Sequence, residues 1–388
     1  MAIELSNLTF TEQDDIVPAS GVEKIFNTGI ANTLAGNDII TGDTGNNSGP
    51  TENRLSGITN TGTLNTEGGN DILTGIFNDQ NTNFFLGLGI YNRGGIIDTG
   101  EGNDIVTGIV QVNRRSFGIG IEGGTINTGN GDDIMTGLGR GGIATLNGSI
   151  NTGDGNDTIT GTGPLDSGIS LSQAGNLDTG KGDDVITGTG LSGISNFLSS
   201  FNSGDGNDII TGNGNSNGNF GGGIFNRGII NTGDGNDIIT GTNTGIGIGI
   251  LNINPSSDGT DNTIDTGDGD DIITGVGALG IHNEGIINTG NGEDSIIADG
   301  GFDGTGSVFL GNGKDYLKGF GSGNFNGGNG KDTLELTSGS YTIGISSAGV
   351  NFTKDGIIMN TSDFEKLQAG NITYNFNSLT NGQTIFVA

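Results

Sequence analysis

One short motif, Gly-x-Gly-x-Asp, recurs along most of this 388-residue chain and restricts the folds that the chain can adopt. The spacing between successive motif aspartates varies from 17 to 34 residues, while the motif itself hardly changes. A rigid motif with variable spacers is typical of a solenoid in which each coil keeps one edge and accommodates loops elsewhere. The motif aspartates are Asp38, Asp71, Asp104, Asp133, Asp157, Asp184, Asp208, Asp237, Asp271, Asp294, Asp315 and Asp332.

Apolar and β-branched residues hold fixed positions around each motif aspartate. The residue two positions after it is always apolar, and most copies have another apolar residue seven positions before it, such as Ile239 and Ile230 around Asp237. In the first ten copies, Asn or Asp lies six positions before the aspartate and Thr or Ser five before. Such short, glycine-bounded segments with period-2 alternation are typical of strands. We expect one strand before each turn, one after it, and a third in segments such as 223–226 and 280–283.

These features predict an all-β fold, a right-handed parallel β-helix or β-roll-like solenoid of about 12 coils. We divide the chain into an N-terminal cap over residues 1–30, solenoid repeats over 31–336 and a C-terminal cap over 337–388. The run EQDDIV at residues 12–17 is interpreted as unlike any repeat. Alternating apolar residues in the C-terminal cap predict one or two β-hairpins.

The composition excludes several classes of function. The chain has 13 lysines and arginines against 44 acidic residues, a formal charge of −31, which argues against binding to nucleic acid or to anionic membranes. It has no cysteine, so disulfides and thiol chemistry are excluded. We expect no membrane span, since no apolar run approaches 18 residues. The first residues lack the features of a Sec-type signal peptide.

The turn itself is suited to a divalent cation. Glycines allow positive φ, so the backbone can direct carbonyls inward, and Ca²⁺ takes six to eight carboxylate and carbonyl oxygens. One turn supplies too few oxygens, but two turns stacked about 4.8 Å apart could share an ion. Without a cation, stacked aspartates would repel one another. Carboxylates at two other turn positions add to that repulsion. They are Glu101, Asp154, Asp205, Asp234 and Asp268 at the third position, and Asp132, Asp183, Asp270 and Glu293 at the fifth. The predicted metal ligands are Asp104, Asp133, Asp157, Asp184, Asp208, Asp237, Asp271, Asp294, Asp315 and Asp332, the third-position Asp154, Asp205, Asp234 and Asp268, and the glycines Gly153, Gly155, Gly204, Gly206, Gly233, Gly235, Gly267, Gly269, Gly328 and Gly330.

The repeats resemble the nonapeptide G-G-x-G-x-D-x-U-x of hemolysin-type, or RTX, proteins. Residues 327–335, GGNGKDTLE, match it in full, and the resemblance covers roughly residues 31–336. In that family the turn binds Ca²⁺, the following residues form a parallel β-roll, and the proteins leave the cell by type I secretion. The family's repeats run at nine residues with ions on both edges, so we expect a single calcium edge here. Leu34 and Glu67 replace a turn glycine in the first two copies, and we expect weak or empty sites there, as part of the cap.

Other interpretations of the same residues remain open. The aspartates could accept backbone N–H groups in a tight turn without metal. The Asn/Asp and Thr/Ser columns before the turn are interpreted as an internal ladder of hydrogen bonds. An ice-binding face would require a flat, outward array of threonines, whereas these threonines adjoin the turn. His282 is interpreted as a variable side chain, and Arg114, Arg115 and Arg140 as solvated loop residues rather than a basic cluster.

The sequence therefore predicts a secreted, non-enzymatic, calcium-binding solenoid with a structural or adhesive role at a cell surface. A cell-surface polysaccharide or another surface protein is the kind of partner expected. Residues 378–388 resemble an uncleaved type I secretion signal, and extracellular calcium could fill weak sites after export. Two alternatives stay open: a polysaccharide lyase or epimerase on a parallel β-helix, and the non-catalytic RTX portion of a toxin-like protein.

Overall fold

A computed structural model describes residues 2–18, 22–45, 55–78, 87–111, 116–218, 221–253 and 262–388. The chain divides into two compact units, Met1–Gly204 and Asp205–Ala388, each of which is described by itself. The described residues are almost entirely β-strand, with 3₁₀ turns at Leu5–Asn7 and Phe376–Ser378. No helix among them is long and apolar enough to cross a bilayer. Arg114 and Arg115 lie outside the described residues.

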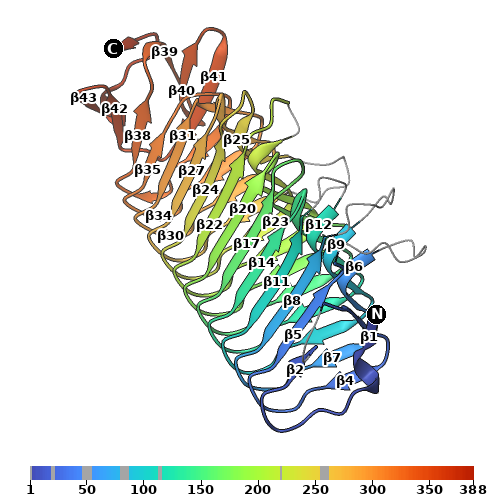
Figure 1. Ribbon diagram of the computed structural model, residues 1–388. Coiled ribbons are helices and arrows are strands. Elements are labelled where there is room, and N and C mark those ends of the chain that lie inside the picture. The colour runs from blue at the N-terminus through green and yellow to red at the C-terminus, as the bar shows by residue number, and fades with distance from the viewer. Residues whose placement is uncertain are drawn as a thin grey trace. The chain divides into compact units, whose positions relative to one another are not determined.

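In the first unit, each coil contributes a strand after the motif turn, a middle strand and a strand before the next turn. The after-turn strands pair in parallel as one sheet, seen side by side in Figure 1: β2 (Ile16–Val17), β5 (Ile39–Asp43), β8 (Ile72–Phe77), β11 (Ile105–Val110), β14 (Ile134–Leu138), β17 (Thr158–Gly163) and β20 (Val185–Gly190). The third strand predicted at 223–226 and 280–283 is confirmed, because these segments lie within the strands Gly222–Asn231 and Leu279–Asn283 of the second unit.

The middle and before-turn strands of this unit form a second parallel array. The middle strands are β1 (Ala2–Glu4), β3 (Lys24–Asn27), β6 (Leu55–Asn60), β9 (Gly87–Arg93), β12 (Ser116–Glu122), β15 (Gly141–Leu146) and β18 (Ile169–Ser172). The before-turn strands are β4 (Ile30–Asn32), β7 (Thr63–Asn65), β10 (Ile96–Asp98), β13 (Thr125–Asn127), β16 (Ser149–Asn151) and β19 (Asn176–Asp178). β21 (Ile194–Asn202) continues both rows as one longer strand.

The second unit repeats this arrangement. Its after-turn strands are β22 (Ile209–Gly214), β24 (Ile238–Asn243), β27 (Ile272–Val276), β31 (Ser295–Asp299), β35 (Tyr316–Lys318), β38 (Thr333–Leu336) and β42 (Lys366–Ala369). Its middle and before-turn strands are β23 (Gly222–Asn231), β25 (Ile248–Asn252), β26 (Thr263–Asp265), β28 (Leu279–Asn283), β29 (Ile286–Asn288), β32 (Phe302–Asp303), β33 (Ser307–Phe309) and β36 (Gly323–Asn326). Within the turns, β30 (Asn291–Gly292), β34 (Asn312–Gly313) and β37 (Asn329–Gly330) form a small third sheet.

Three apolar columns form the core of each coil. The residue two positions after each motif aspartate and the residue seven positions before it are buried, as Ile159 and Ile150 show around Asp157. The middle strands add a third column, which includes Ile58, Ile90 and Ile119. Because each coil stacks like residues on like, neighbouring coils bury surface that no single coil could bury. The parallel β-solenoid predicted from the repeat is thus confirmed.

Glycine brings the two sheets into direct backbone contact behind the after-turn strands. A Cβ atom placed on Gly75 of β8 would lie 2.2 Å from the carbonyl oxygen of Gly89 on β9. The same close approach recurs at Gly42 against Gly57 and at Gly108 against Gly118. No larger residue fits such a contact, which explains why Gly follows Thr in nearly every copy of the after-turn strand.

The N-terminal end corrects one prediction. Residues 12–17 were expected to be unlike any repeat, but β2 pairs in register with β5, so that Ile16 lies beside Ile39. The backbone N–H of Asp15 donates to Asp38 Oδ1 (2.8 Å), and the N–H of Asn37 donates to Asp14 Oδ1 (2.8 Å). The run EQDDIV therefore forms the last part of an additional turn, stacked below the first complete motif.

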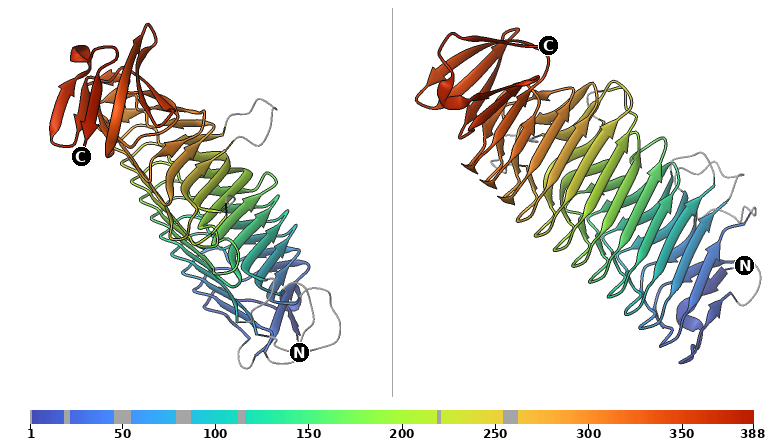
Figure 2. Two further views of the ribbon diagram at one scale, coloured as in Figure 1. Left: turned by 90° about the horizontal axis from the view of Figure 1, so that it is seen from above. Right: turned by 90° about the vertical axis from the view of Figure 1, so that its left-hand side faces the viewer.

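The C-terminal segment contains the predicted hairpins. β39 (Gly339–Ser346) pairs antiparallel with β40 (Gly349–Lys354) and with β44 (Thr384–Val387), and β40 pairs antiparallel with β41 (Ile357–Ser362). β43 (Ile372–Asn375) folds back antiparallel on β42. Figure 2 shows these strands in red at the C-terminal end of the second unit. The boundaries at residues 30 and 336 stay a prediction.

Candidate metal centre

The motif turns share one backbone conformation that requires glycine at two positions. Gly233 and Gly235 adopt φ of +84° and +147°, in the region that favours glycine. A Cβ atom on Gly235 would also lie 1.8 Å from the carbonyl oxygen of Gly206 in the neighbouring turn. All the predicted turn glycines have positive φ: Gly153, Gly155, Gly204, Gly206, Gly233, Gly235, Gly267, Gly269, Gly328 and Gly330. In the first two turns Leu34 and Glu67 take the corresponding position, with φ of +69° and +62°.

The motif aspartates form a buried column inside these turns. Each of the twelve carboxyl side chains is at most 2% exposed. The backbone N–H of one aspartate donates to Oδ1 of the aspartate in the next coil, as from Asp104 to Asp133 (2.7 Å) and from Asp237 to Asp271 (2.8 Å). The backbone-accepting role considered from the sequence is therefore present, but it occupies only one of the two carboxylate oxygens.

The second carboxylate oxygen separates the first two turns from the later ones. In Asp38 and Asp71 the hydroxyls of Thr33 and Thr66 donate to Oδ2, so both oxygens of each carboxylate are hydrogen-bonded. In most of the later turns the threonine hydroxyl still interacts with the carboxyl group, but Oδ2 is buried without a hydrogen bond of regular geometry. Among the described residues, these atoms belong to Asp104, Asp133, Asp157, Asp237, Asp271, Asp294, Asp315 and Asp332.

Several of the threonines before the turns also donate to a backbone carbonyl in the next coil, and Thr66 does so too, to the carbonyl of Thr99 (3.0 Å). Thr99 donates to the carbonyl of Thr128 (3.2 Å), and Thr232 donates to the carbonyl of Thr266 (3.3 Å). This column is buried, as the predicted internal ladder requires. The Asn/Asp column beside it is only half-buried, although it too forms paired hydrogen bonds, such as Asn127 Nδ2 to Asp98 Oδ1 (2.8 Å).

Burial raises the pKa of these carboxyl groups in the metal-free chain. It raises the pKa of Asp133 and Asp237 to about 7 and that of Asp157 to about 6, although the hydroxyl of the preceding threonine and the backbone N–H of the neighbouring aspartate act in the opposite direction. A buried ionised carboxylate with an unused oxygen is costly unless a cation or a proton neutralises it. The column is therefore a set of sites at which positive charge would be bound.

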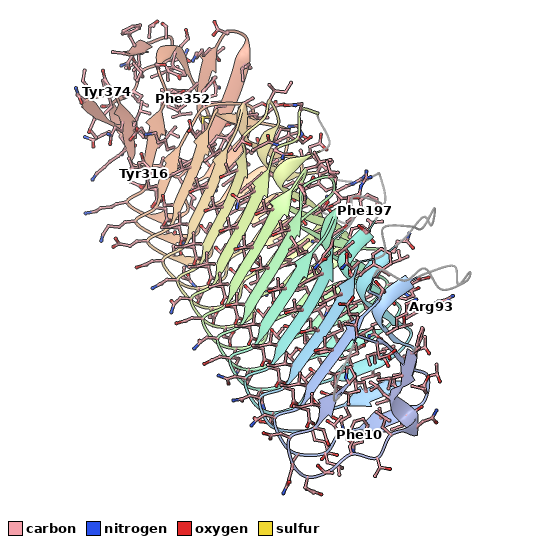
Figure 3. The ribbon with its side chains drawn as sticks, in the orientation of Figure 1. Phe10, Arg93, Phe197, Tyr316, Phe352 and Tyr374 are labelled. Atoms are coloured by element: carbon pink, nitrogen blue, oxygen red, sulfur yellow. The ribbon has the colours of Figure 1, made fainter. Side chains whose placement is uncertain are left out.

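The predicted third-position carboxylates lie elsewhere. Asp154, Asp205, Asp234 and Asp268 are exposed on the outside of the turns, where Figure 3 shows side chains projecting outward. Asp268 accepts a hydrogen bond from Asn291 Nδ2 instead of joining the buried column. At the fifth position, Asp132 accepts the backbone N–H of Asn156 (2.8 Å) and forms an outer ladder. Within the described ranges, no three acidic or histidine side chains converge as a metal site.

The donor set therefore consists of column aspartates together with turn backbone and hydroxyl oxygens. Two hydroxyls in the same turns, those of Thr152 and Thr266, are also buried without a hydrogen bond of regular geometry, and they interact with the carboxyl groups of Asp157 and Asp271 respectively. Oxygen-only sites with one carboxylate per turn suit a hard cation such as Ca²⁺. Aspartates from two consecutive coils are close enough to exchange a backbone hydrogen bond, so a shared ion fits the residues present.

Sequence reasoning missed one residue in each unit that continues the series of aspartates. Asp15 extends it below Asp38, and Glu365 Oε2 accepts the backbone N–H of Asp332 (2.8 Å) in place of a further aspartate. Asp15-Ile16-Val17 matches the end of the motif, so this signal was available in the sequence. Glu365-Lys366-Leu367 matches the end of the motif less clearly, because glutamate replaces aspartate.

Comparisons with known proteins give little beyond the fold. No family model matches the chain, and no curated protein matches its sequence. Among solved structures, it is similar to a hyperactive, Ca²⁺-dependent, β-helical antifreeze protein from an Antarctic bacterium, with 16% sequence identity, 94% of each chain covered and a TM-score of 0.42. The assignment of this chain as a parallel β-solenoid rests on its own strand pairing.

Proposed function

We propose that this protein is a calcium-dependent β-solenoid whose ions bind along the aspartate column of each unit, Asp104 to Asp184 in the first and Asp208 to Asp332 in the second. The single observation that carries the proposal is the series of buried Oδ2 atoms that make no hydrogen bond of regular geometry. Ca²⁺ bound there would neutralise carboxylates that the fold itself forces out of water. Asp38 and Asp71 are proposed as weaker sites, since threonine hydroxyls hydrogen-bond their Oδ2 atoms, although burial raises the pKa of Asp71 to about 6 as well.

The role proposed for this solenoid is structural or adhesive, outside the cell or at its surface. Calcium sites assembled from two coils do not exist in the unfolded chain, so ion binding and folding are coupled. A compartment with abundant calcium would then be where the chain folds, which agrees with an RTX-like protein exported by type I secretion. Surface polysaccharide and other surface proteins are the partners that we propose for its exposed faces.

Far-UV circular dichroism during a calcium titration tests the proposal. After chelation we expect part of the strand signal to be lost, and on addition of Ca²⁺ a cooperative return, because each ion joins two coils. Mg²⁺ at the same concentrations serves as the control and should restore less, since Mg²⁺ demands octahedral geometry and retains its water. Full native signal in excess EDTA would refute the proposal.

A further inference from the structure

The outward face of the after-turn sheet in the first unit consists of three regular rows. Along β5, β8, β11, β14, β17 and β20 the side chains alternate between buried and solvent-accessible positions. We call the accessible positions the threonine face. Its middle row is Thr41, Thr74, Thr107, Thr136, Thr160 and Thr187; the first row is Ile39, Ile72, Ile105, Ile134, Thr158 and Val185; the third row is Asp43, Ile76, Ile109, Leu138, Thr162 and Thr189.

Strand pairing holds these rows in register. Thr107 lies beside Thr74 on one side and beside Thr136 on the other, and Thr160 lies between Thr136 and Thr187. Neighbouring positions in a row are therefore about 4.8 Å apart, and the rows themselves about 6.6 Å apart. The glycine contacts behind β5, β8 and β11 tie these strands to the sheet below. The face is thus a two-dimensional lattice on a rigid support.

The threonine face is almost free of charge in a strongly acidic chain. The whole protein carries a formal charge of −31, yet Asp43, at one edge, is the only charged residue among the eighteen positions of the face. Several of its aliphatic side chains are well exposed, including Ile134 at 42%, Leu138 at 43% and Val185 at 37%. An exposed apolar area of this kind on a soluble domain marks a binding surface.

The hydroxyls of the face are not used within the protein. Across the described part of the chain, none of its nine threonine hydroxyls exchanges a hydrogen bond with another protein atom. The buried threonines before the turns differ, since Thr99 and Thr128 donate to backbone carbonyls. A bound partner must therefore accommodate both the methyl groups and the ordered hydroxyls of the face.

We propose that the threonine face binds ice. Side chains at fixed, repeated spacings fit a partner that is itself periodic. Ice is periodic and offers hydrogen-bond donors and acceptors to every hydroxyl, while the methyl and aliphatic groups exclude disordered water. Ice binding requires an outward array of threonines, and this face provides one. It is made of the threonines after the turns, such as Thr107, and not of the buried threonines before the turns.

Two other periodic occupants fit the face less well. A second copy packed face to face would place the six middle-row hydroxyls in a dry interface, where unpaired polar groups are costly. A crystalline polysaccharide is recognised largely by stacking on aromatic rings, and none of the eighteen positions is aromatic. In the second unit the first three after-turn strands repeat the pattern, with Thr211, Thr240 and Thr274 in register. Tyr316 (Figure 3) and Lys318 end it on β35.

Partition into slowly grown ice tests this inference on the full-length, calcium-loaded chain. We expect the unmodified protein to be enriched in the ice fraction and to give thermal hysteresis. The double variants Thr107→Tyr/Thr136→Tyr and Thr107→Lys/Thr136→Lys alter neighbouring middle-row positions, and both should be excluded from ice. Tyrosine favours strands, which protects the fold of the first variant. Circular dichroism and calcium binding of each variant should match those of the unmodified protein.

The matched control is Thr125→Lys/Ser149→Lys, a registered pair on the before-turn strands β13 and β16 of the same region. It should enter ice as the unmodified protein does. Exclusion of the unmodified protein from ice would overturn the inference, as would equal enrichment of all variants. A dimer in sedimentation that the middle-row variants dissociate, without any ice enrichment, would instead assign the face to a second copy.

Discussion

At the scale of single residues, the chain satisfies a buried aspartate in two ways. In the first two turns a threonine hydroxyl completes the hydrogen bonding of Asp38 and Asp71. In later turns such as those of Asp133 and Asp237, the threonine donates to a backbone carbonyl and also interacts with the carboxyl group, whose Oδ2 makes no hydrogen bond of regular geometry. The buried aspartates of the first two turns and those of the later turns therefore differ in how strongly they require a bound positive charge. This difference can be measured.

Replacing Asp237 by Asn should change the free energy of unfolding in opposite directions without and with calcium. In EDTA at pH 8, D237N should stabilise the chain, by about 1–3 kcal/mol, because it removes a buried ionised group with an unpaired oxygen. In saturating calcium it should destabilise the chain and lower the number of ions bound. Urea unfolding with and without calcium, together with equilibrium dialysis, measures both effects.

Asp71 provides the matched control for that variant. Asn at this position loses a charge-assisted hydrogen bond from Thr66, so D71N should cost about 1.5–3 kcal/mol in both conditions and leave the calcium stoichiometry unchanged. A loss of bound calcium in D71N equal to that in D237N would contradict the distinction between the two kinds of turn.

The pKa values of the column predict an unusual pH dependence for the metal-free protein. Burial raises the pKa of Asp237 from 3.8 to about 7 and that of Asp271 to about 6. Between 3.8 and about 7 the folded chain therefore holds more protons than the unfolded chain, so its stability falls as pH rises through that window. We expect a lower melting temperature in EDTA at pH 8 than at pH 5.

Saturating calcium should reverse this trend, because bound ions keep the carboxylates ionised and protons compete with them. Thermal melts over the same pH range, with and without calcium, provide the comparison. A melting temperature in EDTA that rises steadily from pH 5 to pH 8 would show that the aspartates are not buried in the metal-free fold.

At the scale of strands and turns, glycine determines how closely the two sheets of a coil can approach each other. Gly75 on β8 contacts the backbone of β9, and a methyl group there would approach Gly89 O to 2.2 Å. Gly75→Ala should therefore destabilise the calcium-loaded protein by about 1–3 kcal/mol or more, as overpacking of a tight core does. Urea unfolding in saturating calcium measures this difference.

Gly68→Ala is the matched substitution at an open site. Its added methyl group would lie 3.7 Å from the nearest backbone atom, the Glu101 carbonyl oxygen, which is an ordinary van der Waals contact. Its free energy of unfolding should stay within about 0.5 kcal/mol of the unmodified protein. Equal losses in both variants would mean that loss of backbone freedom, and not the contact between the sheets, sets the cost.

Most of the element scale could be predicted from the sequence, because a solenoid repeats the same signals in every coil. The apolar positions around Asp157 predicted two of the three core columns and the strands that carry them. The contact between Gly75 and Gly89 could not be predicted, since it joins residues on different sheets. The sequence also could not predict that the third-position side chains, such as Asp268, face solvent, because an acidic residue in a turn can face either a bound cation or the solvent.

At the scale of the whole molecule, the formal charge of −31 has two parts that respond to different ions. Exposed carboxylates such as Asp154 and Asp268 are screened by simple salt, whereas the buried column is not. We predict that NaCl at about 1 M, where screening acts beyond ~3 Å, fails to restore the strand signal of the EDTA-treated chain. Circular dichroism at matched ionic strength, with NaCl or CaCl₂, checks this. Full recovery in NaCl would assign folding to general charge screening.

The hydrogen bond that joins each aspartate to the next has the same donor, a backbone N–H, at every step from Asp15 to Asp184 in the first unit and from Asp208 to Glu365 in the second. The acceptor is the aspartate Oδ1 at every step but the last, where Glu365 Oε2 accepts. A segment of the gene that begins and ends at equivalent aspartates can therefore be duplicated or lost, and the coils on either side would still meet with matching partners. Length is thus a property that selection can adjust one coil at a time in such a protein, without redesigning its interior.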